Sequence, residues 1–249
     1  MRRKGQNFLV DRDVLWRIAD YAELNPDDCV LEIGAGTGNL TEVLSHRAGK
    51  VYAVEVDSAL AAGLKGRFAN VVVIEGNALK VELPDYNKVV SNLPYQISSK
   101  ITYRLLSKPF DLAILMYQSE FAKRLISVPG TEGYGRLSMV TGHYARAEIL
   151  ESVSRTAFRP NPQVGSAIVR LRPRPDRLDV NHEAFMRLAT GLFSHRRKKL
   201  GPALEAMGVS REAFAELDES ILDHRAEEID SEMAAWLSNK LYQYNYSIN

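Results

Sequence analysis

Short apolar runs alternate with amphipathic segments along the first half of the chain. The apolar runs predict buried strands, and segments with apolar residues three or four positions apart predict helices between them. Such alternation is typical of a parallel sheet with helices on both faces. Strands are predicted at 29–33, 50–55, 71–75, 88–92 and 111–117, and helices at 13–22, 39–47, 58–68 and 98–106, with Asp13 capping the first helix and Gly49 closing the second.

The second half of the chain departs from this alternation. A helix is expected at 119–126, and an apolar segment at 136–144 precedes two strand-like runs, 147–153 and 166–171. No helix fits between these two runs, so we expect them to pair antiparallel at the sheet edge. Arg172-Pro173-Arg174-Pro175 then interrupts regular structure, and helices are predicted at 181–193, 199–207, 211–217 and 231–244. The chain therefore divides into an α/β domain, 1–174, and a small all-α domain, 175–249.

Charge is distributed unevenly, although the net charge is only +1. Residues 155–199 hold eleven Lys and Arg against three Asp and Glu, whereas residues 200–249 hold three against ten. This asymmetry favours a surface that faces a polyanion, backed by acidic helices. The plainer alternative is a pair of solvated helix faces with opposite charge.

The composition, with 45% hydrophobic and 25% charged residues, is ordinary for a soluble globular protein. No apolar run approaches the roughly 20 residues that span a bilayer, and the basic amino terminus lacks the apolar region of a secretory signal. The single cysteine, Cys29, excludes an intramolecular disulfide framework and fits a reducing compartment. We therefore expect a cytoplasmic protein. The histidines form no cluster with metal-ligand spacing, so no metal is expected.

A glycine-rich turn follows the first predicted long strand, as Glu32-x-Gly34-x-Gly36-x-Gly38. Glycine lets the backbone approach a ligand closely, and the following helix offers unpaired N–H groups. The turn lacks the dinucleotide fingerprint, because that pattern needs glycine where the chain has Asn39 or Thr41. A nicotinamide-dependent oxidoreductase is therefore disfavoured.

Two further polar residues stand at the ends of the next strands. Glu55 is placed to accept hydrogen bonds from ribose hydroxyls, and the Asn77 side-chain oxygen to contact an adenine amino group. Together with the glycine turn they describe a pocket for a nucleoside without phosphates. S-adenosylmethionine is the common cofactor of that kind.

The fourth strand runs into Asn92-Leu93-Pro94-Tyr95. The carboxamide oxygen of Asn92 and the Leu93 carbonyl, held open by Pro94, are placed to accept both N–H bonds of an exocyclic amine, and Tyr95 to stack on its ring. Two acceptors off the ring plane favour a pyramidal nitrogen whose lone pair attacks a methyl group. The alternative is an ordinary strand end closed by a turn.

The chain resembles the small-subunit ribosomal RNA adenine N6,N6-dimethyltransferases of the KsgA type. Six motifs carry the resemblance in order, with the lone Glu55: Gly5-Gln6-Asn7-Phe8-Leu9, residues 32–38, Asn92-Leu93-Pro94-Tyr95, Tyr134-Gly135-Arg136-Leu137-Ser138, residues 158–167, and residues 193–200, which resemble a basic helix. DNA adenine methylases usually carry a second proline where this chain has Leu93. The family usually has Asp where this chain has Asn77, which accepts a hydrogen bond less strongly than a carboxylate.

The resemblance implies a Rossmann-like, seven-stranded methyltransferase sheet with its last strand antiparallel, and S-adenosylmethionine as cofactor. It implies roles for three groups of residues: cofactor contacts by Gln6, Asn7, Leu9, Gly34, Gly36, Glu55, Asn77 and Asn92; catalysis by Asn92, Leu93, Pro94, Tyr95 and Phe158; and RNA binding by Arg196, Arg197, Lys198 and Lys199.

By resemblance, the protein dimethylates two adjacent adenosines in the 3′-terminal hairpin loop of small-subunit rRNA, within an immature ribosomal particle. We expect a monomer, because the sequence shows no signal of a subunit interface. Two alternatives stay open. One is a large-subunit rRNA adenine methyltransferase of the antibiotic-resistance type. The other is a non-catalytic relative that keeps the fold for ribosome assembly or nucleic-acid binding.

Overall fold

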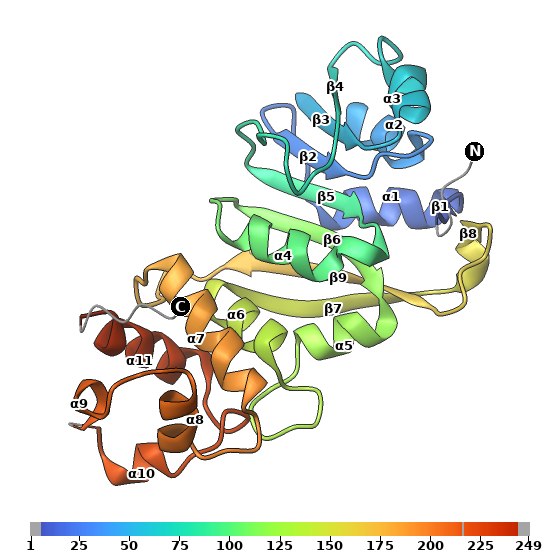
Figure 1. Cartoon of the computed structure of the whole chain (residues 1–249). Helices are drawn as coiled ribbons and strands as arrows, with labels where there is room; N and C mark the ends of the chain where they lie inside the picture. The colour runs from blue at the N-terminus through green and yellow to red at the C-terminus, as the bar shows by residue number, and fades with distance from the viewer. Residues whose placement is uncertain (1–5, 216, 244–249) are drawn as a thin grey trace. The chain divides into compact units, whose positions relative to one another are not determined.

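The structure is a computed structural model that describes residues 6–215 and 217–243 (Figure 1). Gly5, in the amino-terminal motif, and Tyr244, at the end of the last predicted helix, lie outside the described residues. The strands are β1 (Phe8–Leu9), β2 (Cys29–Ile33), β3 (Lys50–Glu55), β4 (Val71–Glu75), β5 (Lys88–Asn92), β6 (Leu112–Gln118), β7 (Ala145–Val153), β8 (Phe158–Arg159) and β9 (Ser166–Pro173).

The helices connect these strands and follow the last of them. They are α1 (Arg12–Tyr21), α2 (Asn39–Ser45), α3 (Ser58–Leu64), α4 (Ser98–Leu106), α5 (Ser119–Leu125), α6 (Arg136–Tyr144), α7 (His182–Ser194), α8 (Leu200–Ala206), α9 (Arg211–Phe214), α10 (Glu219–Leu222) and α11 (Ser231–Gln243), with single 3₁₀ turns η1 (Tyr95–Ile97) and η2 (Arg155–Ala157).

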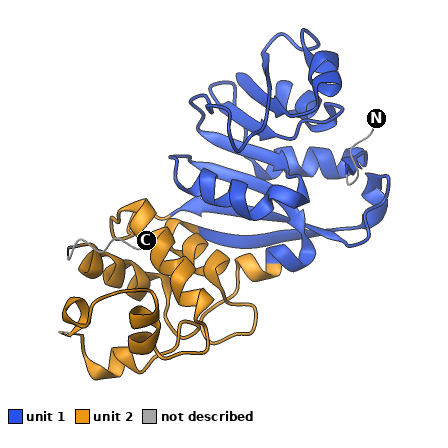
Figure 2. Cartoon of the chain, in the orientation of Figure 1, with its two compact units in different colours: residues 1–122, 146–173 blue, residues 123–145, 174–249 orange. Residues whose placement is uncertain are grey.

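The chain forms two compact units (Figure 2). Unit 1 consists of the described residues up to Ala122 together with Arg146–Pro173, and unit 2 of Lys123–Ala145 together with the described residues from Arg174 onward. One crossing between the units lies beside the predicted boundary at 174. The helical unit also takes in α6, which precedes β7 in the chain.

Unit 1 is built on a sheet with seven strands in the described part of the chain, in the order β4-β3-β2-β5-β6-β9-β7. The strands from β2 to β6 pair in parallel, and β9 pairs antiparallel with β6 from Ala113↔Leu171 to Gln118↔Ser166. The predicted Rossmann-like sheet with its antiparallel last strand is therefore confirmed. The chain moves outward from β2 to β4 and then returns to β5, so a switch point lies between β2 and β5. Ligands bind at such a point in open α/β sheets.

The β2–β5 ladder is short at this switch point. Its register pairs end at Leu31↔Val89, and the Ile33 N–H then donates to the Ser91 hydroxyl oxygen at 2.9 Å instead of to a backbone carbonyl. Both residues are buried. The two strands thus stay connected while their backbones separate, which opens space between their carboxyl ends.

Apolar side chains explain why these strands form. β-Branched residues at positions such as Val51, Val54, Val89 and Val90 are buried, which matches the preference of strands with helices on both faces. Side chains from α1 and α2, including Leu15 and Leu44, join several strands in one core cluster. In Figure 1, α4 lies over the sheet at β5 and β6.

A buried ion pair holds the opposite, amino-terminal ends of β2 and β5 together. Lys88 Nζ lies 2.9 Å from Asp28 Oδ2, with both side chains at most 10% exposed. Asn87 Nδ2 donates to Asp28 Oδ1 at 2.8 Å, and Asn87 Oδ1 accepts from Cys29 N at 2.8 Å. Burial raises the pKa of Asp28, but hydrogen bonds from Asn87 and Lys88 outweigh it, so the net shift is downward.

Several predicted boundaries need correction. Asp11, not Asp13, caps α1: its backbone is extended, and its side chain accepts from the N–H groups of Asp13 and Val14. His46 caps α2, and Gly49 serves a different purpose, since a Cβ there would lie 1.9 Å from the Pro26 carbonyl oxygen. Helix α3 ends at Leu64, four residues earlier than predicted, ahead of Gly66 with φ +73°.

A two-stranded ribbon, β1 with β8, escaped the sequence patterns. Phe8 pairs with Arg159 and Leu9 with Phe158, and the N–H groups of Val10 and Asp11 both donate to the Ala157 carbonyl. Strands of two residues carry no hydrophobic period. The ribbon brings the amino-terminal motif against the segment that follows β7.

We predict that Lys88→Met destabilises unit 1 by about 3–5 kcal/mol, because it leaves a buried carboxylate unpaired. Urea unfolding of the variant and the wild type at pH 7 measures the difference. Lys65→Met is the matched control: it breaks the exposed pair with Glu75 (3.3 Å) and should cost at most about 1 kcal/mol.

The Lys88→Met difference should shrink as the pH falls below the ordinary pKa of aspartate, about 3.9, toward the lowered folded pKa of Asp28. In the folded wild type the pKa of Asp28 is lowered. The stability that the ionised Asp28 contributes is therefore present above the ordinary pKa of aspartate and is lost as the pH falls through the pKa of Asp28 in the folded protein. Equal losses for Lys88→Met and Lys65→Met would contradict the proposed role of the buried pair.

Candidate active site

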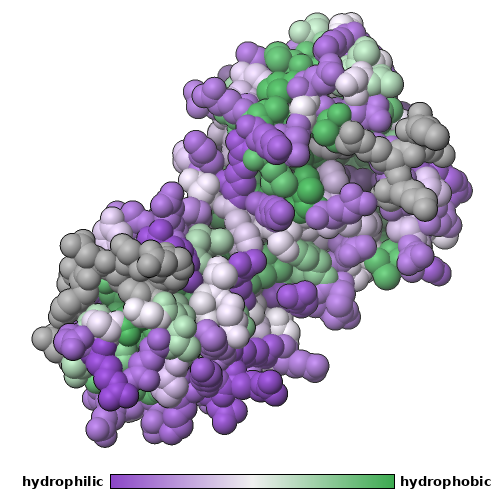
Figure 3. Space-filling view, in the orientation of Figure 1, coloured by the Kyte–Doolittle hydropathy of each residue, from purple (hydrophilic) through white to green (hydrophobic). Residues whose placement is uncertain are grey.

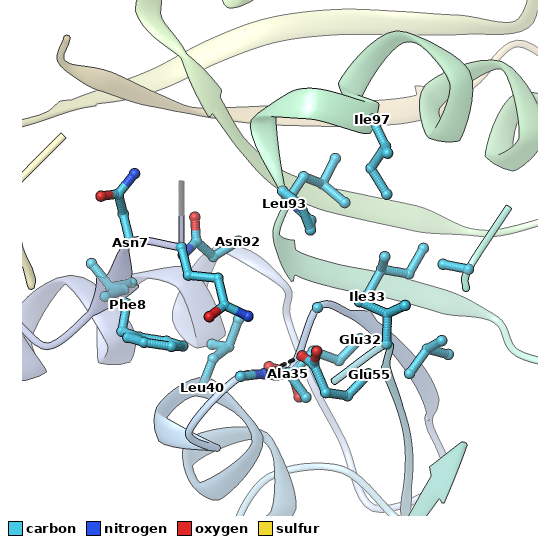
Figure 4. A pocket seen from close by; sticks show the side chains of 18 of the residues that line it. Asn7, Phe8, Glu32, Ile33, Ala35, Leu40, Glu55, Asn92, Leu93 and Ile97 are labelled. Carbon is cyan, nitrogen blue, oxygen red and sulfur yellow. Dashed lines mark hydrogen bonds between the residues drawn. The ribbon is translucent and has the colours of Figure 1, made fainter. Parts of the chain in front are cut away.

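A cavity of about 280 Å³ lies at the carboxyl ends of β2, β3 and β5. It is lined by every residue that the sequence analysis assigned to the cofactor, namely Gln6, Asn7, Leu9, Gly34, Gly36, Glu55, Asn77 and Asn92. Leu93, Pro94 and Tyr95 line the same cavity. The structure thus brings two predicted sites, for cofactor and for catalysis, into one pocket. Figure 4 shows Asn7, Phe8 and Asn92 on one side of it and Glu32 with Glu55 on the other.

The glycine turn allows the other pocket walls to approach. Gly34 has φ +77°, and a Cβ there would lie 2.9 Å from the Pro94 ring. Gly36 has φ +58°, and a Cβ there would lie 3.0 Å from the Phe8 ring. A side chain at Gly34 would push away the loop that contains Pro94, and one at Gly36 would push away the amino-terminal segment that contains Phe8. Either would also strain the backbone.

Glu55 connects the glycine turn to the end of β3. Its Oε2 accepts from Gly36 N at 2.8 Å, and its Oε1 accepts from Asp57 N at 2.9 Å. The carboxylate is only 4% exposed. Each carboxylate oxygen can accept more than one hydrogen bond, so a carboxylate fixed in this way can still accept from two hydroxyl groups.

Glu32 is the second buried carboxyl group of the pocket. Thr41 donates its hydroxyl to Glu32 Oε2 at 2.6 Å. Burial raises the pKa of Glu32 to about 8, the Thr41 hydrogen bond opposes the shift, and nearby Glu55 adds to it. A cation bound beside this pair would favour the ionised form of Glu32.

The amino-terminal segment forms one wall of the pocket. Asn39, the first residue of α2, donates its side-chain N–H to the Leu9 carbonyl at 2.7 Å. Leu9 on its other side pairs with Phe158 in the ribbon. The wall is therefore attached both to the glycine-turn helix and to β8.

Asn77 follows β4 and lies at the edge of the cavity. Its side-chain oxygen accepts from Leu79 N at 2.9 Å, which fixes the amide in a local turn. Arg104 supports the same turn by donating to the Val81 carbonyl at 2.6 Å and also to the Ala78 carbonyl. The remaining acceptor site of the Asn77 oxygen is available for an adenine amino group.

Asn92 ends β5 with an unsatisfied acceptor. Its Oδ1 is buried and has no hydrogen-bond partner among the described residues. Buried polar groups are almost always paired in native proteins, so an orphaned oxygen on a residue that lines a cavity indicates a missing donor. An exocyclic amine supplies such a donor.

Backbone contacts hold the loop after Asn92 in place. Leu93 is 1% exposed, and its N–H donates to the Met116 carbonyl at 3.3 Å, which connects the loop to β6. A proline at this position would lack that donor. Pro94 precedes η1, in which Tyr95 points its hydroxyl to Ser166 Oγ at 2.6 Å.

Phe158 is not brought into this pocket. Its side chain is 0% exposed in the core cluster of unit 1, opposite Leu9 in the ribbon. Its contact with a flipped base stays a prediction, because the ring must be uncovered before a base can lie on it.

The basic run 196–199 does not form the predicted helix. It lies in the turn between α7, which ends at Ser194, and α8, which begins at Leu200. Arg196 pairs with Glu227 at 2.8 Å and Lys199 with Asp223 at 2.9 Å, whereas Arg197 and Lys198 are exposed. Figure 3 shows mainly hydrophilic side chains over this lower part of unit 2. RNA binding by the run stays a prediction.

Sequence reasoning assigned no role in the site to four residues that shape the pocket, although three of them stand in quoted motifs: Phe8, Glu32, Asn39 and Ser166. Glu32 and Asn39 flank the recognised glycine turn, so their positions could have been found from that motif. The contact of Ser166 with Tyr95 joins residues 71 positions apart and carries no local signal. Among the described residues, no three His, Cys, Asp or Glu side chains converge as metal ligands.

Comparisons with known proteins agree with this geometry. Residues 1–238 match the family model described as ribosomal RNA adenine dimethylase. The chain is 54% identical to a probable ribosomal RNA small subunit methyltransferase A of Methanosarcina acetivorans, over 78% of this chain and 74% of that protein. It is 48% identical to the protein with the same description in Thermococcus kodakarensis, over 82% and 73%.

Solved structures give the same result. A dimethyladenosine transferase from Plasmodium falciparum superposes with a TM-score of 0.84 at 27% identity, over 97% of this chain and 100% of that one. The 23S rRNA methyltransferase ErmE superposes with a TM-score of 0.68 at 31% identity, over 95% and 100%. With a family model that matches nearly its full length and curated relatives near half identity, the chain belongs to the ribosomal RNA adenine dimethylase family.

Proposed function

We propose that the protein methylates the exocyclic amine of adenosine in small-subunit ribosomal RNA, with S-adenosylmethionine as methyl donor, and converts two adjacent adenosines of the 3′-terminal hairpin loop to dimethyladenosine. Family membership and the small-subunit relatives support this substrate. The single observation that carries the chemistry is the orphaned Asn92 Oδ1 in a pocket with two buried carboxyl groups.

The residues present fit this cofactor. Gly34 and Gly36 leave room for a nucleoside beside the backbone, Glu55 is placed to accept from ribose hydroxyls, and Asn77 to accept from the adenine amino group. Glu32 provides a buried group whose ionised form favours a cation. When bound, S-adenosylmethionine supplies a methyl group activated by its sulfonium charge.

Asn92 and the Leu93 carbonyl, which we call the Asn92 clamp, hold the substrate amine ready for attack. The Asn92 carboxamide oxygen and the Leu93 carbonyl accept the two amine N–H bonds, and Tyr95 supports the flipped ring. With the cofactor bound, the amine nitrogen held by Asn92 and Leu93 would accept the methyl group that the sulfonium supplies, and this nitrogen would lose a proton to water. Orientation of this kind contributes about 7–11 kcal/mol in well-aligned reactions.

A second candidate is a large-subunit rRNA adenine methyltransferase. The observation that favours it is the similarity to ErmE, at 31% identity. The small-subunit relatives are more similar in sequence, at 54% and 48% identity, and so we prefer the small-subunit substrate.

The cellular setting belongs to the same proposal. We infer that the protein acts as a monomer on an immature ribosomal particle in the cytoplasm, with the exposed Arg197 and Lys198 contacting phosphates. The helices of the described chain include none long and apolar enough to cross a membrane.

Incubation with labelled S-adenosylmethionine should place two methyl groups on each of two adenosines in an unmethylated small ribosomal particle. Mass spectrometry of the released nucleosides identifies dimethyladenosine, and purified large particles serve as the control. Methylation of the large particle alone would favour the ErmE-like alternative. A protein that binds the small particle but takes up no cofactor would be a non-catalytic relative.

Asn92→Ala should lower the rate of methyl transfer by about 100- to 1,000-fold, because one of two groups that align the amine is lost. Single-turnover methylation of the small particle at saturating cofactor measures the rate, and binding of the particle should be retained. Asn70→Ala is the matched control, since it removes an amide that donates to the Ser45 and Ala48 carbonyls away from the pocket. A normal rate in Asn92→Ala would remove the clamp from the mechanism.

Cofactor affinity should rise between about pH 6 and pH 8 by up to about tenfold per pH unit and then level off. The reason is that Glu32, with a pKa of about 8 in the empty protein, must release a proton before it favours the cationic cofactor. Calorimetric titration at several pH values, in buffers with different ionisation enthalpies, measures both the affinity and the released proton.

Stability of the empty protein should change in the opposite direction. The pKa of Glu32 is raised in the folded protein, so its contribution to stability is most favourable below its unfolded pKa and is lost as the pH rises through about 8.

Two variants test the role of Glu32 in cofactor affinity. Thr41→Val removes the hydrogen bond that lowers the pKa of Glu32 and should move the affinity plateau to higher pH. Glu32→Gln should abolish the pH dependence of cofactor affinity. A dependence that survives in Glu32→Gln would assign it to another group.

A further inference from the structure

Tyr95 is held by a partner outside the catalytic loop. Its hydroxyl lies 2.6 Å from Ser166 Oγ, and Tyr95 lines the cavity together with Asn92 and Leu93. The surrounding η1 turn consists of three residues and has no side-chain hydrogen bond at its amino-terminal cap. Local structure alone therefore gives the ring little restraint.

Ser166 is a rigid anchor. It is the first residue of β9, is 0% exposed, and pairs with Gln118 of β6 in the antiparallel part of the sheet. The preceding carbonyl, of Gly165, accepts from Ser119 N at 3.0 Å. The serine is thus fixed by backbone bonds on either side and cannot follow the tyrosine if the loop moves.

We propose that Ser166 is a positioning residue for methyl transfer: it holds the ring of Tyr95 at the place where the flipped adenine stacks with its amine in the Asn92 clamp. This inference rests on the proposed function. It adds a residue that does not line the pocket and acts only through the tyrosine hydroxyl.

The pair is suited to orient a ring and not to exchange a proton. Burial raises the pKa of Tyr95, and the hydrogen bond with Ser166 opposes this only in part, so both groups remain neutral hydroxyls at physiological pH. A tyrosine side chain has two rotatable bonds, and a hydrogen bond to its far end restricts χ1, which sets where the ring lies; the hydroxyl oxygen lies on the axis of χ2, so rotation of the ring plane is left to packing. Orientation matters here because a small misplacement of the reacting atoms lowers the rate steeply.

The experiment is a double-mutant cycle on methylation of the small particle, with the wild type assayed in parallel. Ser166→Ala and Tyr95→Phe, which keeps the ring, should each lower kcat by about tenfold, as expected for one lost hydrogen bond between neutral groups. KM for the particle and the cofactor Kd should stay within about twofold of the wild type. The double variant should be no slower than either single variant, because both remove the same bond.

Thr102→Ala is the matched control. It breaks a hydroxyl pair of the same kind, Thr102 Oγ1 to Tyr117 OH at 2.8 Å, in which both residues are buried and neither lines the cavity. It should lower the melting temperature about as much as Ser166→Ala while leaving kcat unchanged.

Three results would overturn the inference: a normal kcat in Ser166→Ala, an equal loss of kcat in Thr102→Ala, or additive losses in the double variant. If the wild type itself fails to methylate the particle, the proposed function fails instead. The two failures are therefore distinguishable.

Discussion

The hydrogen bond from Ile33 N to Ser91 Oγ marks the place where the sheet becomes a binding site. A parallel sheet whose ladder continued to the strand tips would leave no space between β2 and β5. Here the register pairs end at Leu31↔Val89, and the serine hydroxyl satisfies the next N–H while the strands separate. The pocket walls, from the glycine turn to the Asn92 clamp, depend on this separation of the strands. The separation does not leave the buried N–H of Ile33 unpaired, because this group donates to Ser91 Oγ.

The pocket combines two carboxyl groups with one unpaired amide oxygen, and the three have different surroundings. Glu55 has both oxygens bonded to backbone N–H groups, Glu32 has a single hydroxyl partner and a raised pKa, and Asn92 Oδ1 has no partner. The site is therefore rigid where a ribose is expected and unsatisfied where an amine is expected. A hydrogen-bonding pocket with this distribution selects a positively charged nucleoside and an aromatic amine over phosphate-bearing ligands.

The parallel sheet was predictable because each strand carries a short apolar run with β-branched residues, which is buried in all of the parallel strands except the edge strand β4. Four of the five parallel strands begin and end where predicted. The pocket residues were predictable for a related reason: polar residues that directly follow buried strands must gather at one edge of the sheet. Local patterns did not reveal contacts between distant segments. The β1–β8 ribbon, the Ser166–Tyr95 pair and the acidic partners of Arg196 and Lys199 join such segments.

The β1–β8 ribbon has a practical consequence. Phe8 and Leu9 form part of the pocket wall, and they also provide the only partner strand of β8 among the described residues. A shortened chain that begins after Leu9 would expose Phe158 and uncover the glycine turn in one step. Proteins engineered for crystallisation or labelling therefore need to keep this segment intact and carry their fusion partners at the other terminus.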